Sequence, residues 1–357
     1  MIAEKILTEH PQVALFLVRC RYVDDMAKGT QSHDECQYLI KTVDETFKNY
    51  QLKVKGWAVS KKKPSSDLSS DGLSVSFAGV VWMTELDIYS LNHQPLHFGK
   101  KIRGRLPQNL RIFDPKKETL EQFVPTTLTR RMITSKLMAR YDPTGKEAPL
   151  TMRFKFDLRG LVKVSPDWDA PIPQEMRSQW IQNFGMMEDT RKYWFGRSVV
   201  PVDALDCRKM RIWVKCDAAK GGIMVGAWAG YLRKDKTYSC SHLFGRGLLA
   251  SENLSIPKLE LHSLSSAANV FVLLETALDE WIDVIYVGGD SEISLSWVLY
   301  ENHKLDVFTR NRANNIRSKV PLNKLHWIEG KENLIVLNMS QAKLLVQKVS
   351  GLQEKTG

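Results

Sequence analysis

Three carboxylates in the C-terminal half have the types and positions that metal-dependent chemistry needs. Asp217 ends one predicted strand, Glu260 lies in the first turn of a predicted helix, and Asp290 ends another predicted strand. Clustered carboxylate oxygens suit Mg²⁺ or Mn²⁺, and two such ions ~4 Å apart can activate a water for phosphodiester hydrolysis. The same positions also suit helix and turn capping, and a carboxylate such as Glu260 favours the helix dipole. Spacing alone leaves both interpretations open.

The elements that would position these carboxylates have a mixed α/β pattern. Three strands come first, then a helix, a strand, a second helix and a last strand. Ile256-Pro257 begin the long helix, with proline in the first turn, where its missing N–H costs little. The expected ranges are strands 211–216, 222–232 and 237–249, helix 256–281, strand 284–287, helix 291–300 and strand 324–328.

A second acidic pair, Asp24 and Asp25, interrupts an apolar run near the N-terminus, as at a hairpin turn. After it, apolar residues recur at helical spacing, and Ser32 can cap that helix with Glu35 three residues on. The expected elements are a strand over 13–21, a helix over 32–50, strands over 52–59 and 74–82, and a Lys- and Ser-rich loop over 60–71.

The middle of the chain, 106–195, predicts several helices, among them 127–141 and 174–184. Asp142-Pro143 ends the first, and a proline-rich stretch introduces the second. A change of pattern around 197–208 marks a boundary. The sequence therefore predicts a multidomain chain of α/β and α+β class, divided into 1–100, 101–205 and 206–348.

Composition favours a polyanionic partner. The net charge is +11 and the basic clusters are spread along the first part of the chain, which suits contacts with nucleic-acid phosphates as well as a solvated surface. Five cysteines without a Cys-x-x-Cys pair argue against a disulfide framework or a zinc knuckle. His93 and His97 have metal-like spacing, but Pro95 between them would break a helix. Without an apolar membrane-length run or a signal peptide, we expect a cytoplasmic or nuclear protein and no membrane contact.

Several ordered motifs resemble BEL/Pao-type LTR retrotransposon polyproteins, and the resemblance covers nearly the whole chain. The motifs are Tyr22-Val23-Asp24-Asp25, Trp57, Gly79 to Trp82, Tyr141-Asp142-Pro143-Thr144-Gly145, Trp168-Asp169-Ala170-Pro171-Ile172-Pro173, Val214 to Ala219, Ile256 to Leu261, Gly289-Asp290-Ser291 and Leu295-Ser296-Trp297. The resemblance implies a partial reverse transcriptase palm, a helical thumb- or connection-like segment, and a ribonuclease H-like mixed-sheet domain.

The resemblance also implies roles for particular residues. Asp217, Glu260 and Asp290 match the ribonuclease H metal ligands, while Asp24 and Asp25 match the catalytic, metal-binding pair of the polymerase hairpin. The expected cofactor is Mg²⁺ or Mn²⁺. Residues expected to contact nucleic acid are Tyr22, Gly79, Trp82 and Arg246, the last as a remnant of a basic Lys-Ser-Arg-like segment. By contrast, Trp213, Trp228, Trp281, Trp297 and Trp327 are expected in the core.

Three departures from the family pattern lower the expected activity. Only about 20 residues precede Tyr22, too few for the upstream metal-binding aspartate and the fingers, so this chain alone is not expected to polymerise. The fourth acidic position of the ribonuclease H site aligns with Val336, and only Glu332 or Asn338 offers a substitute. The basic segment is reduced to Phe244-Gly245-Arg246-Gly247. Relatives of this region are sometimes described as a peptidase, but no Asp-Thr/Ser-Gly loop occurs here.

We therefore expect a fragment of a retrotransposon reverse transcriptase/ribonuclease H polyprotein. It would bind RNA–DNA hybrid or duplex and, at most, hydrolyse RNA weakly in hybrids with a divalent metal. It could also contact other parts of the polyprotein. The alternatives are a nucleic-acid-binding module without catalysis, which the missing fourth carboxylate favours, and an inactive retroelement relic.

Overall fold

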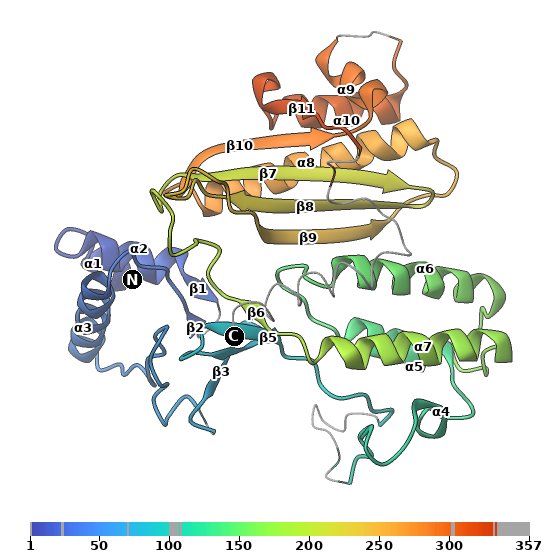
Figure 1. The fold of residues 1–357 in the computed structure, drawn as a ribbon, viewed down its shortest axis with the longest axis horizontal. Helices are drawn as coiled ribbons and strands as arrows, with labels where there is room; N and C mark the ends of the chain where they lie inside the picture. Colours follow the sequence, from blue (N-terminus) through green and yellow to red (C-terminus); the bar gives the residue numbers. More distant parts are fainter. Residues whose placement is uncertain are drawn as a thin grey trace. The chain divides into compact units, whose positions relative to one another are not determined.

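The computed structural model describes residues 2–22, 25–69, 71–99, 107, 109–300, 304–330 and 333. The chain divides into two compact units: residues 1–92 with 194–197, and residues 93–193 with 198–357. Each unit is described by itself below, with its elements labelled as in Figure 1. The predicted division into 1–100, 101–205 and 206–348 stays a prediction.

The N-terminal unit begins with three helices that share a small apolar core. They are α1 (Ile2–Lys5), α2 (Pro11–Arg19) and α3 (His33–Asn49). Val13 and Phe16 of α2 pack against Leu39 and Val43 of α3. The strand predicted over 13–21 is therefore wrong for most of its length. Its β-branched and apolar residues recur at helical spacing, and packing of that face outweighs local strand propensity.

The structure also bears on the helix, the hairpin and the second strand that were predicted for the N-terminal unit. Ser32 caps α3, accepting a hydrogen bond from the Glu35 N–H at 3.1 Å, as predicted. The strands β1 (Arg21–Tyr22) and β2 (Asp25–Met26) pair antiparallel, as the two strands of the predicted hairpin would. The predicted strand over 52–59 is absent, and Trp57 from this stretch packs against the helical core instead.

A four-stranded sheet completes the N-terminal unit. Its strands are β3 (Ser74–Phe77), β4 (Val80–Met83), β5 (Ile88–Leu91) and β6 (Phe195–Gly196), joined in that order. The single strand predicted over 74–82 is thus two strands. The two residues between β3 and β4, Ala78 and Gly79, both have positive φ, 45° and 80°, and form a two-residue hairpin turn.

The second unit contains a helical part and a sheet. The helices are α4 (Leu120–Phe123), α5 (Arg130–Met138), α6 (Ala148–Val164) and α7 (Gln174–Thr190). Their core is built around Phe154, Trp180 and Phe184, each fully buried. The helices predicted over 127–141 and 174–184 are confirmed, and the second continues to Thr190.

Five strands form the mixed sheet of the second unit. They are β7 (Met210–Ala219), β8 (Gly222–Gly230), β9 (Ser241–Leu249), β10 (Ile282–Gly289) and β11 (Leu325–Trp327), in the order β11-β10-β7-β8-β9. Strands β7, β8 and β9 are antiparallel, whereas β10 runs parallel to both β7 and β11. This order confirms the predicted mixed-sheet domain of α/β class.

Helix α8 (Ile256–Ala277) packs on β7, β8 and β10 (Figure 1). In the chain it connects the antiparallel strands β7–β9 to the parallel strand β10. Ile212 and Val287 of the sheet meet Leu261 and Ala268 of this helix in a continuous core. Helices α9 (Glu292–Leu299) and α10 (Val307–Arg317) follow. The sequence predicted every strand and α-helix of this sheet domain except α10, which Asp306 caps and which buries Ala313 and Ile316.

Residues of the helical part of the same unit cover the edge strand β9. The Lys146 ammonium donates to the His242 carbonyl at 3.1 Å, and the Gly245 N–H donates to the Thr144 carbonyl at 3.0 Å. Further along, the Lys155 ammonium donates to the Gly247 carbonyl at 2.8 Å. These contacts satisfy polar groups that an exposed sheet edge would leave free to pair with another chain.

Gly145 makes the closest approach in this contact. Its φ is +72°, and a Cβ at this position would collide with the Gly245 carbonyl. Gly145→Ala should therefore lower the free energy of unfolding by about 2 kcal/mol or more, since it adds left-handed strain to a backbone clash. Denaturant unfolding of the purified protein measures this change.

Gly160→Ala is the matched control. Gly160 lies within α6, and a Cβ there would meet nothing within 4 Å. That substitution should raise stability by roughly 0.5–1 kcal/mol, because alanine is the better helix former. Equal effects at the two glycines would contradict the close packing of 142–147 on β9.

Among the helices in the described stretches, none is long and apolar enough to cross a membrane.

Candidate metal centre

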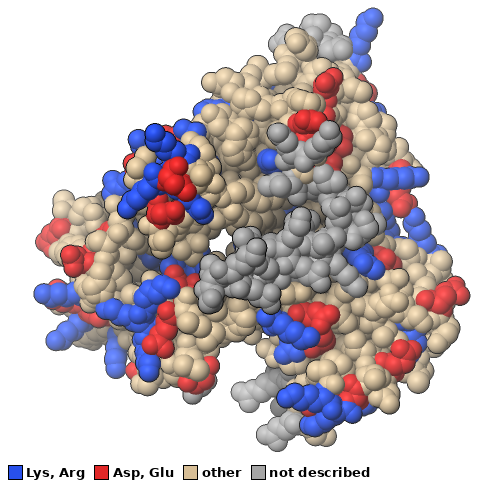
Figure 2. Space-filling view, viewed as in Figure 1, with Lys and Arg blue, Asp and Glu red and all other residues tan. Residues whose placement is uncertain are grey.

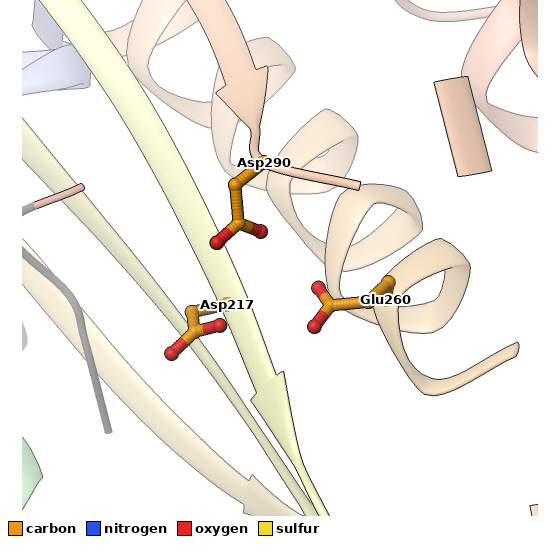
Figure 3. Close-up of side chains that lie close together, drawn as sticks. All are labelled: Asp217, Glu260 and Asp290. Atoms are coloured by element: carbon orange, nitrogen blue, oxygen red, sulfur yellow. The ribbon is translucent and has the colours of Figure 1, made fainter. Parts of the chain in front are cut away.

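The fold brings together the three carboxylates that the sequence singled out. Asp217, Glu260 and Asp290 each offer a carboxylate oxygen, and these oxygens lie within 4.8 Å of one another (Figure 3). Lys215 of β7 pairs with Gly288 of β10, so Asp217 of β7 and Asp290, which directly follows β10, reach the same level of the sheet. Glu260 approaches them from the N-terminal part of α8.

Short polar contacts hold the elements around the site. Ser291 caps α9 by accepting from the Ser294 N–H at 3.3 Å, and the Ser294 hydroxyl donates to the Pro257 carbonyl at 2.9 Å. The start of α8 is thereby tied to the chain that follows Asp290. On the other side, the Trp327 indole N–H donates to the Asp290 carbonyl at 3.0 Å.

Glu260 is only 8% exposed and lies close to two other carboxylates. Burial raises its pKa to about 8, and the negative charges of Asp217 and Asp290 add to this effect. The Ala218 N–H and the Ser263 side chain act in the opposite direction. Without a cation between the three groups, Glu260 therefore carries a proton at neutral pH.

Cys216 lies beside the site but is a poor candidate ligand. Its thiol is fully buried and donates weakly to the Gly288 carbonyl at 3.5 Å. Burial strongly raises the pKa of this thiol, so it stays protonated, and metals bind the thiolate. Among the described residues, the donors at this site are therefore carboxylates, which bind hard cations.

Asn333 also holds the backbone beside the site, a role that was not predicted although it lies in the stretch aligned with the fourth acidic residue. Its side chain is buried and donates to the Cys216 carbonyl at 2.9 Å. Gly330, in the same stretch, lies so close to Asp290 that a Cβ there would be 3.3 Å from a carboxylate oxygen. The chain after β11 therefore returns to the carboxylates.

Several predicted site residues lie elsewhere or outside the described residues. Asp25 is exposed in β2, whereas Asp24 and the side chain of Tyr22 are not among the described parts. Arg246 is exposed on β9. Glu332, Val336 and Asn338, and the basic cluster at Lys100, Lys101, Arg103 and Arg105, also fall outside the described residues. The predicted roles of all these residues remain predictions.

Gly79 and Trp82 belong to the hairpin of the N-terminal sheet. Gly79 closes the turn, and Trp82 follows in β4. The Trp82 indole N–H donates to Asp87 at 3.1 Å, and the guanidinium of Arg197 lies 5.5 Å from the ring centre. The ring is only partly exposed, and these contacts fix its orientation.

The predicted core tryptophans differ in their burial. Trp281 and Trp297 pack against the main core of the sheet domain, as predicted. Trp228 packs on a smaller cluster, and the Trp213 ring lies 4.6 Å from the Tyr286 ring. The prediction is wrong for Trp327, which is 51% exposed because β11 is an edge strand.

The two histidines with metal-like spacing have other partners. His93 Nε2 lies 3.1 Å from the Glu147 carboxylate, which also accepts from Arg140 at 2.6 Å in a buried cluster. His97 Nδ1 lies 3.3 Å from the Lys136 ammonium. Among the described residues, the only group of three or more potential metal ligands is Asp217, Glu260 and Asp290.

Comparison with known families identifies the part of the chain that holds this site. Residues 129–291 match the family model described as the Pao retrotransposon-like RNaseH-like domain. Over this stretch the chain is similar to that family. The match runs from the cap of α5 to just beyond Asp290, so the matched segment includes helices of the second unit, most of its sheet and all three carboxylates.

Solved structures with some likeness include two of a foamy viral protease-reverse transcriptase, both in complex with double-stranded DNA. One is 11% identical and covers 92% of this chain and 48% of its own, and the other is 9% identical and covers 91% and 58%; both have a TM-score of 0.46. The chain thus spans about half the length of these viral proteins. RNase H1 from the archaeon Halobacterium salinarum is 14% identical, covers 41% of this chain and 98% of its own, and has a TM-score of 0.22. No curated protein sequence matches the chain.

The raised pKa of Glu260 predicts a pH-dependent stability in the presence of a chelator. The folded protein holds a proton on Glu260 up to about pH 8, whereas the unfolded chain releases it near the ordinary value of 4.5. Folding therefore takes up a proton between these values, and the free energy of unfolding falls as pH rises through this window. Glu260→Gln should remove this part of the fall, so its Tm decrease between about pH 5 and pH 8 should be smaller by roughly 4 °C or more.

Thermal unfolding of both proteins at a series of pH values measures the difference. Glu275→Gln makes the same chemical change at an exposed position of α8 and should retain the wild-type pH dependence. Identical pH profiles for Glu260→Gln and the wild type would show that burial and the neighbouring carboxylates do not raise the pKa of Glu260.

Proposed function

We propose that this chain is part of a BEL/Pao-type reverse transcriptase/ribonuclease H polyprotein, and that its carboxylate site weakly hydrolyses RNA in RNA–DNA hybrids. The observation that carries the proposal is the meeting of Asp217, Glu260 and Asp290, whose oxygens lie within 4.8 Å of one another. These residues come from two parallel strands and one helix within the segment that matches the Pao family model. The predicted three-part division, with a palm, a connection and a ribonuclease H-like domain, belongs to this proposal.

The residues present fit Mg²⁺ or Mn²⁺. All three donors are hard carboxylate oxygens, and their mutual repulsion is relieved when a divalent cation is held between them. When bound, such ions would activate a water and stabilise the leaving oxygen of the phosphodiester. Asp217, Glu260 and Asp290 would hold them.

The chain's own residues supply the preorganisation. The Ala218 N–H and the Ser263 side chain favour the ionised form of the Glu260 carboxylate, which must lose its proton before it can act as a ligand. Asn333 fixes the Cys216 carbonyl next to Asp217, and Trp327 fixes the Asp290 carbonyl. We expect weak activity because the family's fourth acidic position aligns with Val336.

The N-terminal unit is proposed to be the corresponding part of a reverse transcriptase palm. The short hairpin of β1 and β2 and the exposed Asp25 support this assignment, together with the β3–β4 hairpin that holds Gly79 and Trp82. Asp24 and Asp25 would be the metal-binding pair, while Tyr22, Gly79 and Trp82 would contact nucleic acid. A cytoplasmic or nuclear location belongs to the same proposal.

A second candidate function is nucleic-acid binding without catalysis. The net charge of +11 favours it, and Figure 2 shows Lys and Arg side chains in several separate groups interspersed with acidic residues. Such a distribution suits contacts with phosphates along a duplex. An inactive relic is the remaining alternative, and it would show neither property.

Cleavage of a labelled RNA strand in an RNA–DNA hybrid tests the leading proposal. Wild-type protein should cleave slowly with Mg²⁺ or Mn²⁺, whereas Asp217→Asn and Asp290→Asn should each lose at least about 90% of that rate, since each removes a charged metal ligand. A folded wild-type protein that binds the hybrid but leaves its RNA intact would instead support the binding module.

Metal binding itself has a separate readout. Mn²⁺ should raise the Tm of the wild-type protein in a concentration-dependent way, because the ion binds the folded state. The shift should be absent or much smaller in Asp217→Asn and Asp290→Asn. If Mn²⁺ shifts all three proteins equally, the three carboxylates are not the metal site.

A further inference from the structure

The ammonium of Lys155, on α6, lies against β9, the edge strand of the five-stranded sheet. Its ammonium donates to the Gly247 carbonyl of β9 at 2.8 Å, and the side chain is partly buried there. Arg246, the neighbouring residue on β9, is exposed. Burial and the nearby positive charge of Arg246 both lower the pKa of Lys155. Two cations from different parts of the matched segment thus lie close together.

No carboxylate among the described residues forms an ion pair with either of these cations. Two other basic residues of α6, Arg159 and Lys163, differ in this respect, since they lie 3.3 Å and 2.5 Å from the Glu252 carboxylate. Lys155 and Arg246 lack such a partner and repel each other. An anion placed against both would remove that repulsion and add charge-assisted hydrogen bonds.

The pair also has a defined position relative to the carboxylates. Gly247 pairs with Met224 of β8, and Met224 pairs with Asp217 of β7, so the three residues form one row across the sheet. Neighbouring strands lie about 4.8 Å apart, which puts the backbone at Gly247 roughly 10 Å from that at Asp217. This separation is short enough for one nucleic-acid strand to contact both places.

We propose that Lys155 and Arg246 form a phosphate-binding pair that holds the sugar–phosphate backbone of a nucleic-acid strand lying at the carboxylate site. The position of that strand rests on the proposed function. Lysine supplies a compact charge and arginine a planar fork, a combination that suits phosphodiester oxygens and reads no base sequence. The helical part of the matched segment thereby contributes directly to substrate binding.

The salt dependence of hybrid binding tests this pair. Affinity of the full chain for a labelled RNA–DNA hybrid would be measured in EDTA over a series of salt concentrations. Each phosphate contact contributes roughly 0.9 to the slope of log K against log salt. Lys155→Gln and Arg246→Gln should each reduce the slope by about that amount, and the double variant by about twice as much.

Lys163→Gln is the matched control, because it removes a charge from the same helix at a position paired with Glu252. It should leave the slope close to that of the wild type. Arg246 is exposed, so its variant should fold even if Lys155→Gln weakens the contact between α6 and β9. Unchanged slopes in both single variants, or a wild-type chain that does not bind the hybrid, would overturn the pair.

The assay separates this inference from the proposed function because binding in EDTA requires no metal and no cleavage. Reduced slopes in a protein that never cleaves RNA would support the phosphate-binding pair and contradict the hydrolase. Cleavage by the wild type, with unchanged salt slopes in Lys155→Gln and Arg246→Gln, would support the hydrolase and contradict the phosphate-binding pair.

Discussion

The parallel pairing of β7 with β10 is the constraint on which the candidate site depends. These strands are far apart in the sequence, and α8 makes the connection between them. Because their register aligns Lys215 with Gly288, Asp217 and Asp290 emerge side by side at the same end of the sheet. The crossover helix then needs to supply only one carboxylate, Glu260, to complete the group.

This arrangement opposes ordinary folding energetics, since three acidic groups are brought close together and one of them is buried. The rise in the Glu260 pKa is the direct sign of that conflict. The surrounding chain maintains the geometry through buried contacts such as those of Asn333 and Ser294. Functional sites commonly keep such unfavourable local arrangements, which the stability of the fold supports.

The helical part of the second unit covers the edge strand β9, and both lie within the segment that the family model matches. The loop around Gly145 and the ammonium groups of Lys146 and Lys155 satisfy the sheet edge, so the helical part and the sheet form one compact unit. The family match starts at the cap of α5 and therefore includes both parts. Protection of the sheet edge and the placement of the Lys155 ammonium next to Gly247 result from the same contacts.

Most elements of the sheet domain and its three carboxylates could be predicted from the sequence. Apolar periodicity and a proline in the first turn are local signals, so the strands around Asp217 and Asp290 and the start of α8 were predictable from neighbouring residues alone. Tertiary structure decided the rest. Residues 13–21 have strand-like composition yet form mostly helix, because burial of Val13 and Phe16 against α3 outweighs local propensity. The roles of Asn333 and Lys155 depend on carbonyls at Cys216 and Gly247, about a hundred residues away, and no local pattern records contacts over such a distance.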